Sequence, residues 1–335
     1  MNLFRVLLRL ASFERTRQQC AASSRIQYVH FRKAGRGCSM LSASIATSLS
    51  LRSAISMSLR HCSTSHASTR GLLLMLALCT ATPIAAQQAT GSARPIRGLY
   101  VTGGGFHDFV AQEKIIPPGI SARTNIAWTI DHTAGKSTEV LIPRHQTTAW
   151  ADSFDVVVYN MSFSHVVDTA WIQRIAHAHR DKGVAAVILH GATHSYRRST
   201  SEAWKELMGA ASMRHDSQRE FPRLERLVAD NAIVKALPKE WGPGSDELYN
   251  IDKTWPSATP LVQAWSIEGE KHHPVVWTNT HGKAKVFVTT MGHTNRTMSD
   301  SVYLDLVTRG LLWTVGKLNA DGTPAAGYGA RAAAP

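Results

Sequence analysis

Short runs of apolar, mostly β-branched residues recur from Arg97 onward and alternate with amphipathic stretches. The runs at 156–158 and 187–189 contain no polar residue, as expected for strands that are buried on both faces. Such runs, separated by helical stretches, are typical of a parallel sheet with crossover helices. The sequence therefore predicts an α/β fold: a single three-layer, doubly wound domain built on a mostly parallel sheet.

The periodicity also places individual elements. Strands are predicted at 98–102, 128–132, 155–159, 185–189, 275–278 and 285–290. A helix is predicted over 168–181, with Asp168 as its N-cap and Gly183 just past its end. A last helix is predicted over 301–318. The Gly-, Ala- and Pro-rich segment 319–335 is predicted to be disordered.

The first 90 residues differ from the rest in charge and in cysteine content. They hold eleven of the 37 basic residues and a single acid, Glu14, and they hold all four cysteines: Cys20, Cys38, Cys62 and Cys79. The downstream domain therefore has no disulfide, no thiolate zinc site and no cysteine nucleophile. Because the excess positive charge lies in a segment that looks removable, we expect no nucleic-acid partner.

Residues 57–86 have the form of a secretory signal peptide. Arg60 and Arg70 precede the apolar run 71–78, and small residues follow up to Gln87. The run is too short to span a bilayer, so no membrane span is expected after removal, and the product is predicted to be secreted or periplasmic. A lipid anchor on Cys79 is disfavoured by Leu78. Residues 1–56 are interpreted as a targeting or non-native extension, with an organelle transit peptide as the alternative.

Polar residues follow the first predicted strand in the sequence Thr-Gly-Gly-Gly-Phe-His-Asp, at 102–108. Ligands of doubly wound sheets bind beyond the carboxyl ends of the strands, so His107 and Asp108 are candidate substrate-binding residues. The alternative is a tight glycine turn that these two side chains cap.

Two further predicted strands end in Gly-His or His-Gly sequences. The first runs into His190, at the apex of a strand-to-turn elbow, and then into His194. The second runs into His293, followed by Asn295. Imidazole at such a position serves as a general acid, a general base or a metal ligand. We therefore name His190 and His293 as candidate catalytic residues, and His194 and Asn295 as candidate substrate-binding residues.

The segment between these motifs supplies more candidates. Trp204, His215, Glu247 and Tyr249 could add aromatic surface, an imidazole and a carboxylate to one pocket. Histidines and carboxylates together could hold zinc or another divalent ion, although the chain has no His-Glu-x-x-His spacing. The sequence alone names neither the metal nor the residues that would bind it.

The sequences of these motifs resemble those of the ThuA-like (trehalose utilisation) family. The similarity includes Asp-Glu-Leu-Tyr-Asn at 246–250 and the segments 274–295 and 303–318, and it extends over nearly all of 97–318. It implies a class I glutamine amidotransferase-like fold, related to the flavodoxin-like folds. Such amidotransferases carry a cysteine at the elbow and a glutamate near the later histidine. Here His190 and Asn295 occupy those places, so glutamine hydrolysis through a thioester is excluded.

The family implies a function connected with trehalose, other disaccharides and keto-sugars. We expect an enzyme, a hydrolase or isomerase, that acts on a small sugar by histidine acid–base or metal-assisted chemistry. The alternative is a carbohydrate-binding or partner-docking domain without catalysis. The absence of Gly-x-Gly-x-x-Gly argues against a nicotinamide-dependent oxidoreductase. The oligomeric state is left open, a homo-oligomer being one alternative.

Overall fold

The computed structural model describes residues 93–330. The extension 1–56, the predicted signal peptide 57–86, all four cysteines and residues 331–335 lie outside the described residues. Within 93–330, no helix has the length and apolar character needed to cross a membrane.

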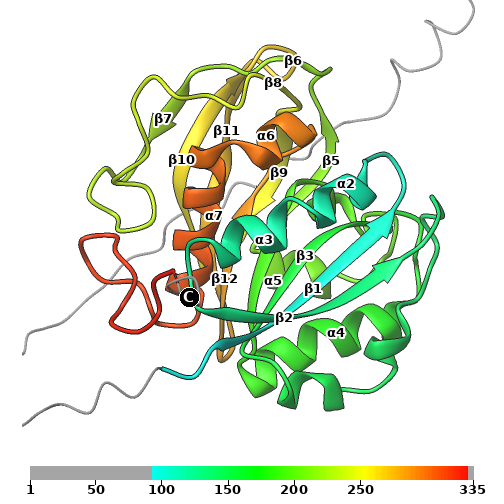
Figure 1. Ribbon diagram of the computed structural model, residues 1–335. Coiled ribbons are helices and arrows are strands. Elements are labelled where there is room, and N and C mark those ends of the chain that lie inside the picture. The colour runs from blue at the N-terminus through cyan, green and yellow to red at the C-terminus, as the bar shows by residue number, and fades with distance from the viewer. Residues whose placement is uncertain (1–92, 331–335) are drawn as a thin grey trace, which may run out of the picture. The chain divides into compact units, whose positions relative to one another are not determined.

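One eight-stranded sheet organises the domain (Figure 1). Its order is β2 (Ile126–Thr133), β1 (Ile96–Gly104), β3 (Val156–Ser162), β4 (Ala185–Leu189), β12 (Ala284–Thr289), β11 (Lys271–His281), β10 (Ala258–Ser266) and β7 (Leu224–Arg226). The first five strands are parallel, and the last three continue the sheet in antiparallel pairs. Strands β3 and β4 are buried along their whole length, which confirms the interpretation of their uninterrupted apolar runs.

Helices cover both faces of the sheet and complete three layers. The first core contains α4 (Thr169–Lys182) and α5 (Ala203–Met208), packed against the side of β1 that carries Leu99. The second contains α3 (Ile116–Ser121) and α7 (Ser301–Thr314), packed against the side that carries Tyr100. Successive side chains of a strand point to opposite faces of the sheet, so each strand contributes residues to both cores. The predicted doubly wound α/β architecture is confirmed.

The termini of α4 match the sequence prediction. Asp168 accepts a hydrogen bond from the backbone N–H of Trp171 (2.9 Å), and Gly183 ends the helix at φ 81°. An aspartate at the N-cap and a glycine in the left-handed region are the usual way to satisfy the two ends of a helix. This helix links the buried strands β3 and β4 and so sets their parallel arrangement.

Between α5 and β11 the structure contains strands that the sequence analysis missed. Besides β7 and β10, they are β5 (Ala210–His215), β6 (Arg219–Glu220), β8 (Ser245–Asp246) and β9 (Tyr249–Thr254). β5 pairs with β9 and β6 with β8, both antiparallel. These strands are short or partly exposed, so they lack the apolar runs that reveal β3 and β4.

The C-terminal segment corrects two predictions. The last long helix, α7, ends at Thr314 rather than at residue 318. Residues 319–330, predicted to be disordered, form turns and bind to the domain. Thr124 donates from its hydroxyl to the carbonyl of Tyr328 (2.6 Å), and the backbone N–H of Asn125 donates to the same carbonyl (3.3 Å). Composition alone predicted disorder because it contains no information about these long-range backbone contacts.

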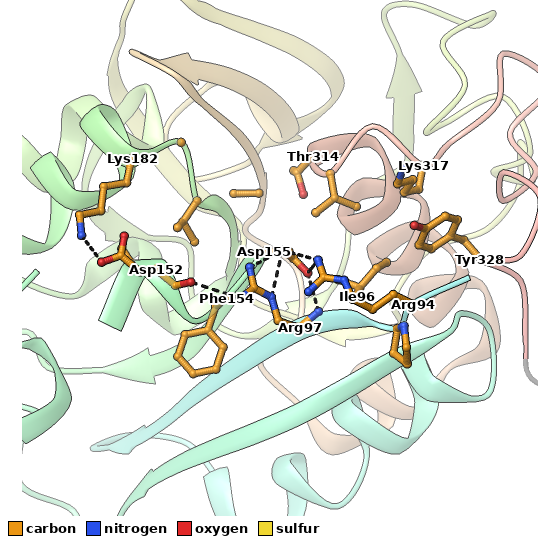
Figure 2. A pocket seen from close by; sticks show the side chains of 16 residues that line it. Arg94, Ile96, Arg97, Asp152, Phe154, Asp155, Lys182, Thr314, Lys317 and Tyr328 are labelled. Carbon is orange, nitrogen blue, oxygen red and sulfur yellow. Dashed lines mark hydrogen bonds and ion pairs between the residues drawn. The ribbon is translucent and has the colours of Figure 1, made fainter. Parts of the chain in front are cut away.

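A cavity of about 570 Å³ lies at the N-terminal ends of β1 and β4 (Figure 2). We call it the far cavity. Asp155 pairs there with Arg97 (2.8 Å) and Arg94 (3.4 Å), and Asp152 pairs with Lys182 (2.6 Å). Both of its carboxylates are therefore matched by cations of the same chain.

Candidate active site

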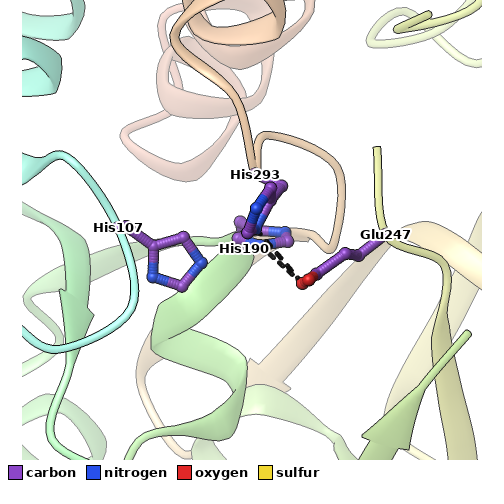
Figure 3. Close-up of side chains that lie close together, drawn as sticks. All are labelled: His107, His190, Glu247 and His293. Carbon is purple, nitrogen blue, oxygen red and sulfur yellow. Dashed lines mark ion pairs between the residues drawn. The ribbon is translucent and has the colours of Figure 1, made fainter. Parts of the chain in front are cut away.

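Four side chains converge at the opposite ends of these strands, where ligands of doubly wound sheets bind. His107 follows β1, His190 follows β4, His293 follows β12, and Glu247 lies between β8 and β9. One ligating atom from each lies within 4.8 Å of the others (Figure 3). The structure thus brings together both predicted catalytic histidines and two of the predicted substrate-binding residues. We call these four residues the His–Glu cluster.

His190 occupies the elbow in a strained backbone conformation. Its φ of 36° is unusual for a residue with a side chain and is of the kind found at functional sites. Its Nδ1 lies 2.6 Å from the carbonyl oxygen of Thr290. A carbonyl only accepts, so Nδ1 carries a proton, and Nε2 is the ring nitrogen that points toward the rest of the cluster. That Nε2 faces Glu247 Oε2 at 3.5 Å.

His107 presents a lone pair to the cluster. Its Nδ1 donates to the carbonyl of Gly105 (3.3 Å), and its Nε2 is buried without a hydrogen-bond partner among residues 93–330. Burial, together with the neighbouring His190 and His293, lowers the pKa of His107 to about 3, so the ring is neutral at physiological pH. Gly191 makes room for it, because a Cβ there would lie 2.9 Å from His107 Cε1.

Asp246 holds the two remaining members in position. Its carboxylate accepts backbone N–H bonds from Glu247 (2.8 Å), Gly292 (2.9 Å) and His293 (3.0 Å). Asp246 is buried and therefore connects the loop before β9 to the loop after β12. Sequence reasoning placed it in a motif but not in the site. A buried carboxylate whose lone pairs are taken by backbone N–H groups is a positioning element.

The carboxylate of Glu247 dominates the electrostatics of the cluster. Burial alone would raise its pKa, but contacts with His190 and His293 outweigh burial and lower it. In return, Glu247 raises the pKa of His293. His293 Nδ1 lies 3.2 Å from Glu247 Oε2 yet is not aligned for a hydrogen bond with it. The two atoms are close without pointing directly at each other.

Three stacked rings form one wall beside the cluster. Tyr249 stacks on His194 at 4.0 Å between ring centroids and on His215 at 5.3 Å, and its hydroxyl lies 3.4 Å from His190 Nε2. Burial lowers the pKa of His194 well below its ordinary value, and Arg197 donates to its Nδ1 (3.0 Å). His194, His215 and Tyr249, all predicted as substrate-binding residues, therefore lie beside the cluster.

These groups enclose a cavity of about 270 Å³, which we call the cluster cavity. Its lining consists of Phe106, His107, Ser162, Ser164, His194, Arg197, His215, Glu247, Tyr249 and His293. Phe106 was missed by sequence reasoning. Its side chain is 66% exposed and its φ is 75°, which is strained for a bulky residue. Its position directly before His107 is the feature of the sequence that could have identified it as a site residue.

Four predicted site residues do not line this cavity. His190 belongs to the His–Glu cluster but is buried, at 1% exposed, and is not among the lining residues. Trp204 is buried in the hydrophobic core, where its indole N–H donates to the carbonyl of Ala192 (3.0 Å). Asp108 caps α2 (Phe109–Glu113) by accepting from Ala111 N–H (3.1 Å). Asn295 donates to Asp108 (2.9 Å). The capping alternative for Asp108 is the one that the structure shows.

The cluster provides three imidazole nitrogens and one carboxylate oxygen. This donor set suits zinc, iron or nickel, whereas calcium and magnesium prefer oxygen ligands. Without a metal, the same groups could exchange protons, with Glu247 orienting His293. Metal binding and histidine acid–base chemistry, the two alternatives expected from the sequence, would thus use the same four side chains.

The family model described as ThuA, trehalose utilisation, matches residues 118–314. The chain belongs to the ThuA family. A ThuA-like protein from Parabacteroides merdae is 18% identical, with a TM-score of 0.53 over 71% of this chain and 98% of that one. A ThuA-like protein from Bacteroides uniformis is 15% identical, with a TM-score of 0.51 and the same coverage. At these identities the two structures support the fold alone. No curated protein matches this ThuA family member.

Proposed function

We propose that this ThuA family member is a metal-dependent enzyme that acts on a small sugar, with a divalent ion held by the His–Glu cluster. One observation carries the proposal. One ligating atom from each of three imidazoles and one carboxylate lies within 4.8 Å of the others, and Nε2 of His107 is buried among them without a hydrogen-bond partner in residues 93–330. Three imidazoles and a carboxylate that converge in this way form a donor set that suits a divalent cation.

The distances support a single ion. Bonds of about 2.0–2.2 Å to a tetrahedral zinc place neighbouring ligand atoms roughly 3.4 Å apart. The separations from Glu247 Oε2 to His293 Nδ1 (3.2 Å) and to His190 Nε2 (3.5 Å) are close to that value. His107 is the ligand that would move inward. The backbone carbonyls that bind Nδ1 of His107 and His190 orient these rings, as partners of ligating histidines commonly do.

A bound divalent ion would polarise a sugar oxygen or lower the pKa of a bound water molecule. The chain's own residues would bind and orient the substrate. Ser162 and Ser164 offer hydroxyl groups, and Arg197 offers a fixed cation. Phe106 offers an exposed aromatic face of the kind on which the C–H-rich face of a sugar ring packs.

The choice of a sugar rests on the family description, trehalose utilisation, and on the hydroxyl, guanidinium and exposed aromatic groups that line the cluster cavity. These two grounds support disaccharides and keto-sugars as the substrates to test first. The predicted signal peptide supports a secreted or periplasmic location. These are arguments from association and from chemistry at the site.

Elemental analysis combined with a sugar-conversion assay tests this function. We expect about one zinc, iron or nickel ion per purified chain, and conversion of at least one disaccharide or keto-sugar detected by mass spectrometry. His293→Gln should lose both the metal and the activity. His272→Gln is the matched control, because His272 is partly exposed and pairs with Glu225 (3.2 Å) away from the cluster.

Two results would contradict parts of the proposal. A chain that stays metal-free after incubation with zinc, iron or nickel, yet converts sugar, would favour histidine acid–base chemistry. A chain that binds sugar without forming product would favour a carbohydrate-binding domain.

A further inference from the structure

We infer that Tyr249 is a further catalytic residue, whose phenol hydroxyl donates a hydrogen bond to the substrate oxygen that reacts at the His–Glu cluster. This inference rests on the proposed function, which places that oxygen at a divalent ion. Tyr249 lines the cluster cavity, and its hydroxyl lies 3.4 Å from Nε2 of His190. The hydroxyl is therefore within reach of a group that binds at the cluster.

The local sequence brings Tyr249 and Glu247 to the same site. Glu247 lies between β8 and β9, and Tyr249 is the first residue of β9. Residues two apart along an extended chain point to the same side, and Leu248, between them, is buried in the second core. One short segment thus supplies the cluster with a carboxylate and, two residues later, with a phenol.

Two imidazole rings fix the plane of the Tyr249 ring. His215 is its direct partner in the pairing of β5 with β9, and the two ring centroids lie 5.3 Å apart. His194 stacks on Tyr249 at 4.0 Å. The centroids of His194 and His215 are separated by only 5.9 Å, so both imidazoles pack on the same face of the phenol ring.

Hydrogen bonds hold these two imidazoles in turn. Arg197 donates to Nδ1 of His194 (3.0 Å), and Nε2 of the same ring lies 2.9 Å from Oγ of Ser212. Nδ1 of His215 donates to the carbonyl of Asp216 (2.9 Å). The phenol therefore rests on rings that are themselves fixed. A donor held in place before the reaction needs no reorganisation when charge develops on the substrate.

Metal binding at His190 would redirect the phenol proton. A nitrogen that coordinates an ion has no lone pair left, so Nε2 of His190 could then accept no hydrogen bond from Tyr249. The hydroxyl is buried, and a buried donor without an acceptor is costly. A substrate oxygen bound at the cluster would be its new acceptor. Negative charge that builds on this oxygen would strengthen the hydrogen bond and so lower the barrier.

Tyr249→Phe tests the inference, because it keeps the stacked ring and removes only the hydroxyl. For the zinc-loaded protein, we expect kcat for sugar conversion to fall about 100-fold or more with little change in KM, as when one oxyanion donor is lost. Acetohydroxamate, a small chelator that binds zinc through an anionic oxygen, gives a readout without turnover. Its affinity, measured by calorimetry, should fall about ten-fold or more, whereas the zinc content should not change.

Tyr196→Phe is the matched control. The Tyr196 ring is also 2% exposed, but it packs edge-on against Trp204 (5.1 Å) and does not line the cluster cavity. If Tyr249→Phe retains the wild-type kcat or the wild-type affinity for acetohydroxamate, the inference is overturned. Loss of zinc from Tyr249→Phe, or an equal loss of kcat in Tyr196→Phe, would also overturn it. A failure of the proposed function is distinct, because the wild-type protein itself would then bind no metal or convert no sugar.

Discussion

The two ends of the same parallel strands hold cavities of opposite character. The far cavity, at the N-terminal ends, has about twice the volume of the cluster cavity, and its carboxylates pair with Arg97, Arg94 and Lys182 (Figure 2). At the other ends of these strands, His107, His190 and His293 converge on the carboxylate of Glu247 (Figure 3). Volume therefore does not identify the site. The convergence of three imidazoles on one carboxylate identifies it, because these groups suit metal binding or proton transfer.

Neutralising one carboxylate at each end of the strands tests whether the two ends differ in function. Glu247→Gln should reduce bound metal to below a tenth of the wild-type level. It should reduce sugar conversion by at least about 1,000-fold, since the ion supplies several kcal/mol of transition-state stabilisation. Asp155→Asn, in the far cavity, should retain full metal and activity. Equal losses in the two variants, measured by elemental analysis and turnover, would show that the two ends are not functionally distinct.

A smaller effect is expected from crowding one ligand. A Cβ at residue 191 would lie 2.9 Å from Cε1 and 3.1 Å from Nδ1 of His107, so Gly191→Ala should displace that ring. We expect metal affinity to fall by about 10–100-fold, the range typical of altered support for a ligand. Gly242→Ala is the control, because nothing lies within 4 Å of a Cβ there. Competition with a fluorescent zinc chelator measures both; unchanged affinity in Gly191→Ala would remove His107 from the ligand set.

Replacing Phe106 should weaken substrate binding without affecting metal binding. Phe106→Ala removes the exposed ring that lines the cluster cavity, so KM should rise about five- to ten-fold, with kcat and metal content nearly unchanged. Phe106→Gly should be more stable than Phe106→Ala by about 1 kcal/mol, because glycine tolerates φ of 75°. Thermal unfolding and initial rates give the two values. A fall in kcat with constant KM would instead indicate that the ring acts in the chemical step.

The smallest effect is expected in the far cavity and depends on pH. Burial alone would raise the pKa of Asp155, but hydrogen bonds from Arg97 lower it. A lowered pKa in the folded state stabilises the protein above the ordinary carboxyl pKa of about 3.9, and this contribution is lost as pH falls toward the folded-state value.

Asp155→Asn should therefore cost about 1 kcal/mol or less at pH 7, because the pair is partly exposed and screened. The difference from wild type should shrink below about pH 4. Urea unfolding at the two pH values tests this, and a difference that grows on acidification would refute it.

Much of the fold was predictable because it depends on local signals. The apolar runs of β3 and β4 and the caps of α4 at Asp168 and Gly183 appear in the sequence as they appear in the structure. The strands between α5 and β11 were not predictable in this way. Their stability comes from pairing with distant partners, such as β5 with β9, and their short, partly exposed sequences carry little apolar pattern.

By itself, the sequence determined the α/β class, the cysteine-free domain and the strand ends at which His190 and His293 lie. Strand ends are set by local apolar patterning, and parallel strands bring their carboxyl ends to one edge. Only the tertiary structure decided which side chains meet there. It joined Glu247 and His107 to the two histidines, placed Trp204 in the core and put Phe106 at the cavity border. Those outcomes depend on packing and on bonds such as those of Asp246, which connect segments far apart in the chain.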